Sequence, residues 1–208
     1  MYVDTLPVGP LQTNCYLITC AESGEAALID PGWKQPAIFE AIARRAAVVK
    51  IILNTHAHWD HIGGNAELVR STGAVLAVPE GDLPLLRKRG GADEWGIPLE
   101  PSPEPDRLLA GGEIIEVGTL RLMVLFTPGH TPGHVCFYES THRALFDGDV
   151  LFNGGIGRTD LPGGNMADLM RSIRDVLFGL PADTVVYPGH GPHTTIGNEQ
   201  RYNPWLSG

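Results

Sequence analysis

His56-Ala57-His58-Trp59-Asp60-His61 follows directly on an apolar, β-branched run, Val48-Val49-Lys50-Ile51-Ile52-Leu53. The run predicts a buried strand, and in extended chain after it His56 and His58 point to the same side. Imidazole nitrogens bind zinc, iron and similar metals, and Asp60 and His61 add an oxygen and a further nitrogen. Four ligand-type side chains in six residues are too dense for one tetrahedral ion that keeps a position open for water. The stretch therefore predicts two adjacent metal ions.

Three further ligand-type residues lie at the ends of other predicted strands. They are His130 after strand 120–126, Asp149 after strand 143–146, and His190 after strand 184–187. Glycine and proline beside each residue favour a sharp turn that aims its side chain back over a sheet edge. We expect these side chains to join the first cluster.

The remaining pattern predicts short strands interrupted by single helices. Strands are expected at 14–19, 26–29, 48–53, 74–78, 114–117, 120–126, 135–138, 143–146 and 184–187, and helices at 35–45, 65–70 and 166–178. Asn65 is the predicted N-cap of the second helix, and the Pro- and Gly-rich segment 87–106 is a predicted loop or lid. Strand clusters with helices in both halves favour an α/β fold of two sheets with helices outside. The length of 208 residues fits one domain, 1–208.

Composition excludes several classes of function. A net charge of −9 and a pI of about 5.3 argue against a nucleic-acid partner. No apolar run is long enough to span a membrane, and the N-terminus has no signal-peptide pattern. Three cysteines do not suggest a disulfide framework. We expect a cytoplasmic protein, monomeric or a small homo-oligomer, that acts on a small molecule.

Together these motifs resemble the metallo-β-lactamase-fold hydrolases over essentially the full chain. Within that superfamily the chain is similar to the short bacterial glyoxalase II-like, or hydroxyacylglutathione hydrolase-like, branch. The stretches that carry this resemblance are TPGHTPGH (127–134), GDVLF (148–152), GRTD (157–160), YPGHG (187–191) and the ending at 199–205. The resemblance implies a four-layer αββα sandwich of two mixed β-sheets flanked by helices.

The resemblance also implies a ligand set for two divalent metal ions, with zinc expected and iron or manganese as alternatives. The first metal would be held by His56, His58 and His130. The second would be held by Asp60, His61 and His190. Asp149 would bridge both ions, where zinc β-lactamases place a cysteine at the second metal.

A mechanism follows from such a site. Two adjacent cations held there would lower the pKa of a shared water and so supply a metal-bound hydroxide for attack on a thioester carbonyl. Asp60 is the expected catalytic residue, because it can orient the nucleophile and take its proton. Asp30 and His134 are expected to hold ligands by hydrogen bonds, with a purely structural role as the alternative for His134.

The expected substrate is a thioester such as S-D-lactoylglutathione. Arg158 is either a contact to the glutathione part or a structural partner of Asp160, and the sequence leaves both open. Two departures from glyoxalase II argue against specificity for glutathione. Gly191-Pro192 follows His190, and 208 residues leave no room for the helical domain of that enzyme.

Other reactions on the same fold remain alternatives. A mononuclear-iron persulfide dioxygenase would use His56, His130 and Asp149, two histidines and a carboxylate in the arrangement that suits oxygen activation. A nuclease is disfavoured by the acidic pI.

Overall fold

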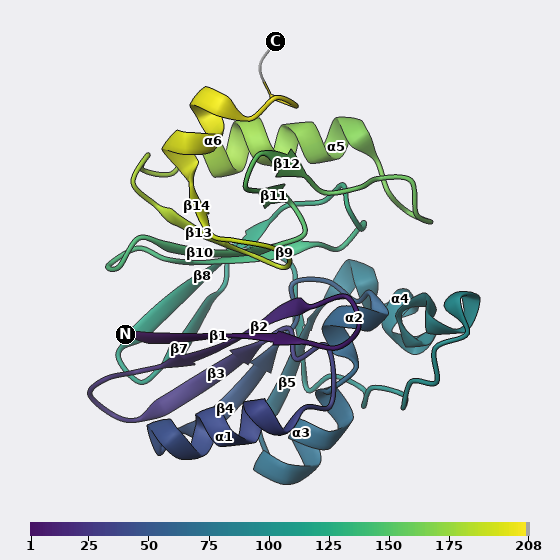
Figure 1. Ribbon diagram of the computed structural model, residues 1–208, viewed down its shortest axis with the longest axis vertical. Coiled ribbons are helices and arrows are strands. Elements are labelled where there is room, and N and C mark those ends of the chain that lie inside the picture. Colours follow the sequence, from purple (N-terminus) through teal and green to yellow (C-terminus); the bar gives the residue numbers. More distant parts are fainter. Residues whose placement is uncertain (207–208) are drawn as a thin grey trace.

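Two β-sheets face each other and helices cover their outer faces (Figure 1). The computed structural model describes residues 1–206. The predicted α/β sandwich is confirmed, and residues 207 and 208 of the predicted single domain lie outside the described part.

The first sheet comes from the N-terminal half of the chain. Its strands, in spatial as well as chain order, are β1 (Tyr2–Val8), β2 (Thr13–Thr19), β3 (Glu25–Ile29), β4 (Val48–Leu53), β5 (Val75–Pro79) and β6 (Arg107–Leu109). β1, β2 and β3 pair antiparallel, whereas β3 to β6 run parallel. The carboxyl ends of β3, β4 and β5 therefore meet at one edge.

The second sheet comes from the C-terminal half. In chain order its strands are β7 (Ile114–Val117), β8 (Leu120–Phe126), β9 (Val135–Glu139), β10 (Ala144–Gly148), β13 (Val185–Pro188) and β14 (Thr194–Thr195). Their spatial order is β14-β13-β10-β9-β8-β7, with β10 and β13 parallel and the other pairs antiparallel. A separate hairpin, β11 (Leu151–Phe152) with β12 (Gly155–Ile156), follows β10.

The helices form the outer layers. They are α1 (Pro36–Arg45), α2 (Trp59–Ile62), α3 (Asn65–Thr72), α4 (Leu83–Arg87), α5 (Met166–Arg171) and α6 (Ile196–Tyr202). Short 3₁₀ turns cover Glu80–Asp82, Arg89–Trp95 and Leu177–Gly179, and a π-helical turn covers Ser172–Val176. In Figure 1, α1 and α3 lie beneath the first sheet, and α5 and α6 lie above the second.

Three apolar layers separate these four layers of structure. One lies between the two sheets and contains Ile18 and Leu53 from the first sheet and Leu122 and Phe137 from the second. Another packs α1 and α3 on the first sheet, and the third packs α5 and α6 on the second. The three cysteines are buried and free, as expected.

One local prediction was wrong. Asn65 does not cap its helix: the N-cap is Gly64, and the Asn65 side chain instead bonds with Asn54 and Ser102. The predicted helix at 166–178 is confirmed: it is α-helical to Arg171, and a π turn and a 3₁₀ turn continue it. Within residues 1–206, no helix is both long and apolar enough to cross a membrane.

Candidate metal centre

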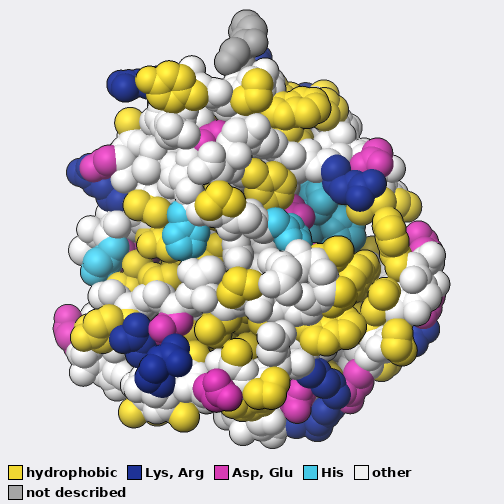
Figure 2. Space-filling view, viewed as in Figure 1, with side chains coloured by type: hydrophobic (Ala, Val, Ile, Leu, Met, Phe, Trp, Pro, Cys, Tyr) yellow, Lys and Arg dark blue, Asp and Glu magenta, His cyan; other side chains and the backbone are white. Residues whose placement is uncertain are grey.

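Strand ends from both sheets bring the predicted ligands to one edge of the sandwich. Asp30 follows β3 and His56 follows β4 in the first sheet, while His130, Asp149 and His190 follow β8, β10 and β13 in the second. Figure 2 shows histidine side chains gathered in a hollow on this face, bordered by hydrophobic side chains.

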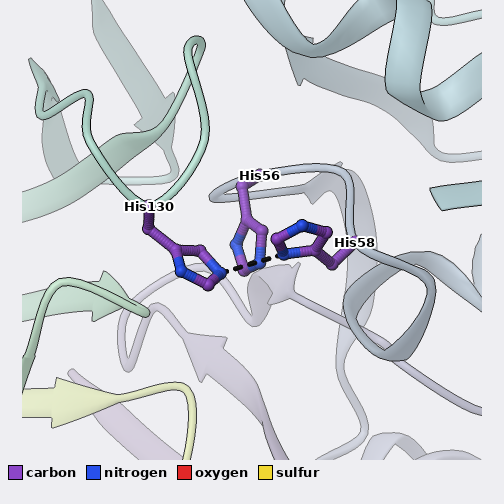
Figure 3. A group of neighbouring side chains, drawn as sticks. All are labelled: His56, His58 and His130. Atoms are coloured by element: carbon purple, nitrogen blue, oxygen red, sulfur yellow. Dashed lines mark hydrogen bonds between the residues drawn. The ribbon is translucent and has the colours of Figure 1, made fainter. Parts of the chain in front are cut away.

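One group of ligand atoms is purely imidazole, and we call it the first triad: His56, His58 and His130. One nitrogen from each ring lies within 4.8 Å of the others, and all three side chains are buried. His58 Nδ1 and His130 Nε2 are 2.9 Å apart, and the ring of His56 is seen between these two rings in Figure 3. Three facing nitrogens are a donor set that suits zinc or iron.

A second group, the second triad, consists of Asp60, His61 and His190, whose ligand atoms also lie within 4.8 Å of one another. Asp60 Oδ2 lies 3.4 Å from His61 Nε2 and 3.2 Å from His190 Nε2. Asp60 and His61 come from the short helix α2, and His190 comes from the turn after β13. A mixed oxygen and nitrogen set is equally suited to a divalent cation.

Asp149 lies between the two triads. Its Oδ1 is 3.5 Å from His61 Nε2, and its Oδ2 is 3.5 Å from His130 Nε2. Gly189 is needed beside it, because a Cβ built there would lie 2.2 Å from Asp149 Oδ1. Oδ2 also lies 3.7 Å from His190 Nε2, so the carboxylate reaches histidines of both triads.

Hydrogen bonds on the outer side fix several rings. His61 Nδ1 lies 2.9 Å from Asp30 Oδ2, His130 Nδ1 lies 2.7 Å from the carbonyl oxygen of Arg158, and His190 Nδ1 lies 3.2 Å from the carbonyl oxygen of Leu11. Oxygens of this kind only accept, so each Nδ1 donates and each Nε2 keeps a lone pair toward the centre when the ring is neutral.

Three buried polar atoms at the centre have no hydrogen-bond partner among residues 1–206: His56 Nε2, His61 Nε2 and Asp149 Oδ1. Leaving such atoms unpaired is costly unless another group satisfies them. Lone pairs held inward, together with a buried carboxylate, fit divalent cations at both triads.

The electrostatics differ between the triads. Burial, followed by the neighbouring imidazoles, lowers the pKa of His56 and lowers the pKa of His58 to about 3, so both rings stay neutral and able to bind metal. Burial opposes charge on His61 as well, but Asp60, Asp149 and Asp30 outweigh it and raise the pKa of His61 to about 10. A field that stabilises a proton there also stabilises a metal cation.

Asp30 lies where the sequence predicted a supporting residue. Its carboxylate accepts from His61 Nδ1, from the Thr55 backbone N–H at 2.8 Å and from Thr55 Oγ1 at 2.6 Å. Although Asp30 also lies near His56, its Oδ2 already accepts from His61 Nδ1 and Thr55 Oγ1, and its Oδ1 accepts from the Thr55 backbone N–H. It therefore orients His61.

His134 contacts the backbone of Asp149 through its ring. The Asp149 backbone N–H donates to His134 Nε2 at 3.2 Å, and His134 Nδ1 lies 3.0 Å from Thr127 Oγ1. The ring is buried and stacks on His56 with centroids 5.1 Å apart. His134 thus supports the turn that carries Asp149.

The centre opens into a cavity of about 440 Å³. Its walls include residues of the site together with Leu11, Trp95, Phe152, Ile156, Arg158 and Leu161. A neighbouring cavity of about 540 Å³ shares His58, Gly90, Trp95 and Leu161 with it. The segment predicted as a lid therefore supplies a wall of both cavities through Gly90 and Trp95.

Arg158 lines the cavity and also forms a bidentate ion pair with Asp160, with distances of 2.7 and 2.8 Å. Both side chains are more than half exposed. In this position Arg158 pairs with Asp160 and can also contact a substrate in the cavity, so the two roles considered for it are compatible.

Three polar residues that support the site were not expected from the sequence. Thr13 Oγ1 donates to Asp60 Oδ2 at 2.9 Å, Thr55 links Asp30 to His56, and Asp82 is a buried carboxylate beside the first triad. Asp82 had a signal: it follows β5, whose carboxyl end lies beside that of β4 in a parallel sheet. Thr13 had none, because it is the first residue of β2, where a threonine is ordinary, and it reaches Asp60 only through tertiary folding.

Comparison with known proteins gives consistent matches. The sequence profile of the metallo-beta-lactamase superfamily matches residues 8–190. Hydroxyacylglutathione hydrolase GloC of Haemophilus influenzae is 39% identical over 210 residues, covering 100% of this chain and 99% of GloC.

Solved structures with different names share the fold. BLEG-1 B3 metallo-beta-lactamase gives a TM-score of 0.94 at 37% identity, with both chains covered completely. TTHA1623, solved in a di-iron-bound form, gives a TM-score of 0.89 at 40% identity, and the match covers 99% of this chain and 100% of TTHA1623. ETHE1 from Myxococcus xanthus gives a TM-score of 0.84 at 30% identity, and the match covers 99% of this chain and 84% of ETHE1.

Proposed function

The chain belongs to the metallo-beta-lactamase superfamily, and from this premise we propose that it hydrolyses thioesters of the hydroxyacylglutathione type. The observation that carries the proposal is the pair of triads with Asp149 between them. The likeness to a hydroxyacylglutathione hydrolase along nearly the whole of both chains supports the substrate class.

Two metal ions are part of this proposal. His56, His58 and His130 would hold one, Asp60, His61 and His190 would hold the other, and Asp149 would contribute to both. Bound divalent cations supply a water of lowered pKa and polarise the acyl carbonyl. Zinc and iron both suit these donors, and a di-iron form is known for the similar protein TTHA1623.

Asp60 is the proposed proton acceptor. Its carboxylate lines the cavity, and Oδ2 is fixed by the hydroxyl of Thr13 and lies near His190. A carboxylate held in this way can orient an attacking water and take its proton as the carbonyl is attacked.

The cavity has apolar walls and a charged group at its rim. Phe152, Ile156 and Leu161 offer apolar surface, whereas Arg158 supplies a cation at the rim. A guanidinium there can bind a carboxylate of the thiol part of the substrate. We assign Arg158 this contact, with Asp160 orienting the guanidinium.

A second candidate reaction uses fewer ligands. His56, His130 and Asp149 are two histidines and a carboxylate, the set found in oxygen-activating mononuclear iron sites. Asp149 Oδ2 lies 3.5 Å from His130 Nε2, close enough to complete such a set.

One experiment separates the two candidates. Purified protein, loaded separately with zinc and with iron, is assayed for hydrolysis of S-D-lactoylglutathione and for oxygen uptake with glutathione persulfide. Thioester hydrolysis that requires metal, without persulfide-dependent oxygen uptake, is the expected result. Oxygen uptake by the iron form with no thioester hydrolysis by either form would replace the hydrolase proposal with the oxygenase.

A further inference from the structure

Asp82 is a buried carboxylate that the proposed reaction does not use. It lies at the end of the 3₁₀ turn Glu80–Asp82, just after β5, and its side chain is 1% exposed. Burying a carboxylate is costly unless its oxygens are well paired, so a side chain in this position calls for a specific reason.

The hydrogen bonds of Asp82 supply that reason. Its Oδ2 accepts from the Ala57 backbone N–H at 3.0 Å and from Thr131 Oγ1 at 2.7 Å, while its Oδ1 accepts from the Gly133 backbone N–H at 2.7 Å. Ala57 stands between His56 and His58, and Thr131 follows His130.

A single carboxylate therefore ties together the two loops that carry the first triad. One loop follows β4 of the first sheet and the other follows β8 of the second, so the triad spans the interface between the sheets. We propose that Asp82 is a positioning residue that sets the spacing of these loops and thereby the affinity of the first triad for its metal. This role rests on the metal sites of the proposed function.

The backbone around Asp82 is shaped for the contact. A Cβ on Gly133 would lie 2.4 Å from the Asp82 backbone nitrogen and 2.7 Å from Asp82 Oδ1. A Cβ on Gly81 would lie 2.7 Å from the Gly133 Cα. Glycine at both positions lets the turn after β5 approach the His130 loop closely enough for the carboxylate to reach it.

The second triad is held by other groups. Asp30 orients His61, Thr13 fixes Asp60, and the carbonyl of Leu11 accepts from His190. Among the described residues, the three hydrogen bonds of Asp82 all go to the loops of the first triad. Loss of Asp82 should therefore weaken one metal site and spare the other, which a general loss of stability would not do.

The test isolates each triad in its own background. His190→Ala leaves the first triad intact, and His58→Ala leaves the second intact. Zinc affinity is measured in each by competition with a chromophoric chelator, with and without Asp82→Ala. We expect Asp82→Ala to lower zinc affinity by about 10- to 100-fold in the His190→Ala background and to leave it unchanged in the His58→Ala background.

Two further variants guard against misfolding and non-specific effects. Asp82→Asn keeps at most two of the three hydrogen bonds and should lose less affinity than Asp82→Ala. Glu139→Ala is the matched control, because Glu139 is also buried (2% exposed) and also accepts a backbone N–H, that of His142, but ends β9 at the opposite edge. In metal-free protein, amide hydrogen exchange at Ala57 and Gly133 should become faster in Asp82→Ala and stay the same in Glu139→Ala.

Two outcomes would overturn the role of Asp82. Unchanged zinc affinity in the His190→Ala background shows that the contact does not set the first site. An equal loss in both backgrounds shows a general structural role. Failure of the unsubstituted protein to bind zinc or iron at all would instead contradict the proposed function, so the two ideas can fail separately.

Discussion

Asp149 is the residue on which both proposed metals depend, because its carboxylate lies 3.5 Å from a histidine of each triad. We expect Asp149→Ala to reduce bound metal and to lower kcat/KM by about 100-fold or more, since both cations lose an anionic oxygen. Metal analysis and the thioester assay on the same sample check this. The control is Glu116→Ala, which removes an exposed carboxylate paired with Arg121. Full metal content with full turnover in Asp149→Ala would rule out the bridging position.

Arg158 tests the substrate class. If its guanidinium binds a glutathione carboxylate, Arg158→Ala should lower kcat/KM for glutathione thioesters by about 10- to 100-fold, mostly through KM. A small thioester without those carboxylates should lose almost nothing, and metal content should stay the same. The ion pair with Asp160 is exposed, so its loss should have little effect on stability. An equal loss of kcat/KM for both substrates would contradict the contact to glutathione and indicate a general acyl hydrolase.

The residues brought together at the site were predictable from the sequence because they follow strands and belong to one chemical type. His56, His130, Asp149 and His190 all follow strands whose ends meet at one edge. Supporting contacts could not be found in this way. Thr13 has an ordinary residue type for a strand, and only the folded chain brings its hydroxyl to Asp60.

At the level of elements, Glu199 fastens the C-terminal helix α6 to the β11–β12 hairpin. Its carboxylate accepts from the Gly154 backbone N–H at 2.9 Å and from Asn203 Nδ2 at 2.8 Å. Asn203 also donates to the carbonyl oxygen of Gly155 at 3.0 Å. The hairpin in turn supplies Phe152 and Ile156 to the cavity wall. This contact gives the ending at 199–205, singled out from the sequence, a structural role.

Glu199→Ala should loosen that wall without touching the metals. Each donor left unpaired costs about 1–3 kcal/mol, so we expect lower stability together with a higher KM for S-D-lactoylglutathione and unchanged metal content. Thermal unfolding, metal analysis and steady-state kinetics check the three effects. An unchanged KM in a destabilised variant would show that the hairpin does not shape the substrate site.

Helices and strands could be predicted where burial imposes a strong apolar pattern on the sequence. β4 was expected at its observed bounds because it is an apolar, β-branched run, and α1 was expected within one residue because its apolar residues have helical spacing. β1 was not expected: it is a half-exposed edge strand with Asp4 and Pro7 in its sequence. The two-residue strands β11, β12 and β14 are defined by their partners, so no local pattern could predict them.

For the whole molecule, the apolar layer between the sheets holds the two halves of the site together. Phe137 in β9 is fully buried in this layer, whereas Met123 in β8 is 44% exposed. We expect Phe137→Ala to lower the free energy of unfolding by about 3–5 kcal/mol. Met123→Ala should change it by no more than about 0.5 kcal/mol. Denaturant unfolding compares the two variants, and equal effects would contradict a core between the sheets.

The arrangement in layers could be expected from the strand clusters and helices, and the family resemblance implied the αββα sandwich. The order of strands within each sheet could not be expected from the sequence, because pairs such as β10 with β13 join segments far apart in the chain. Site geometry depends on that order, since the edge where the ligands meet is set by which strands run parallel.

The number of metal ions per chain tests the central claim most directly. Metal-free protein is reconstituted with zinc and, separately, with iron under anaerobic conditions, and freed of excess metal. Bound metal per chain is then measured by mass spectrometry of the elements, alongside His190→Ala. We predict two ions per chain in the unsubstituted protein and one in His190→Ala, which keeps the first triad. A single ion per chain in both proteins, with either metal, would contradict the two-metal site.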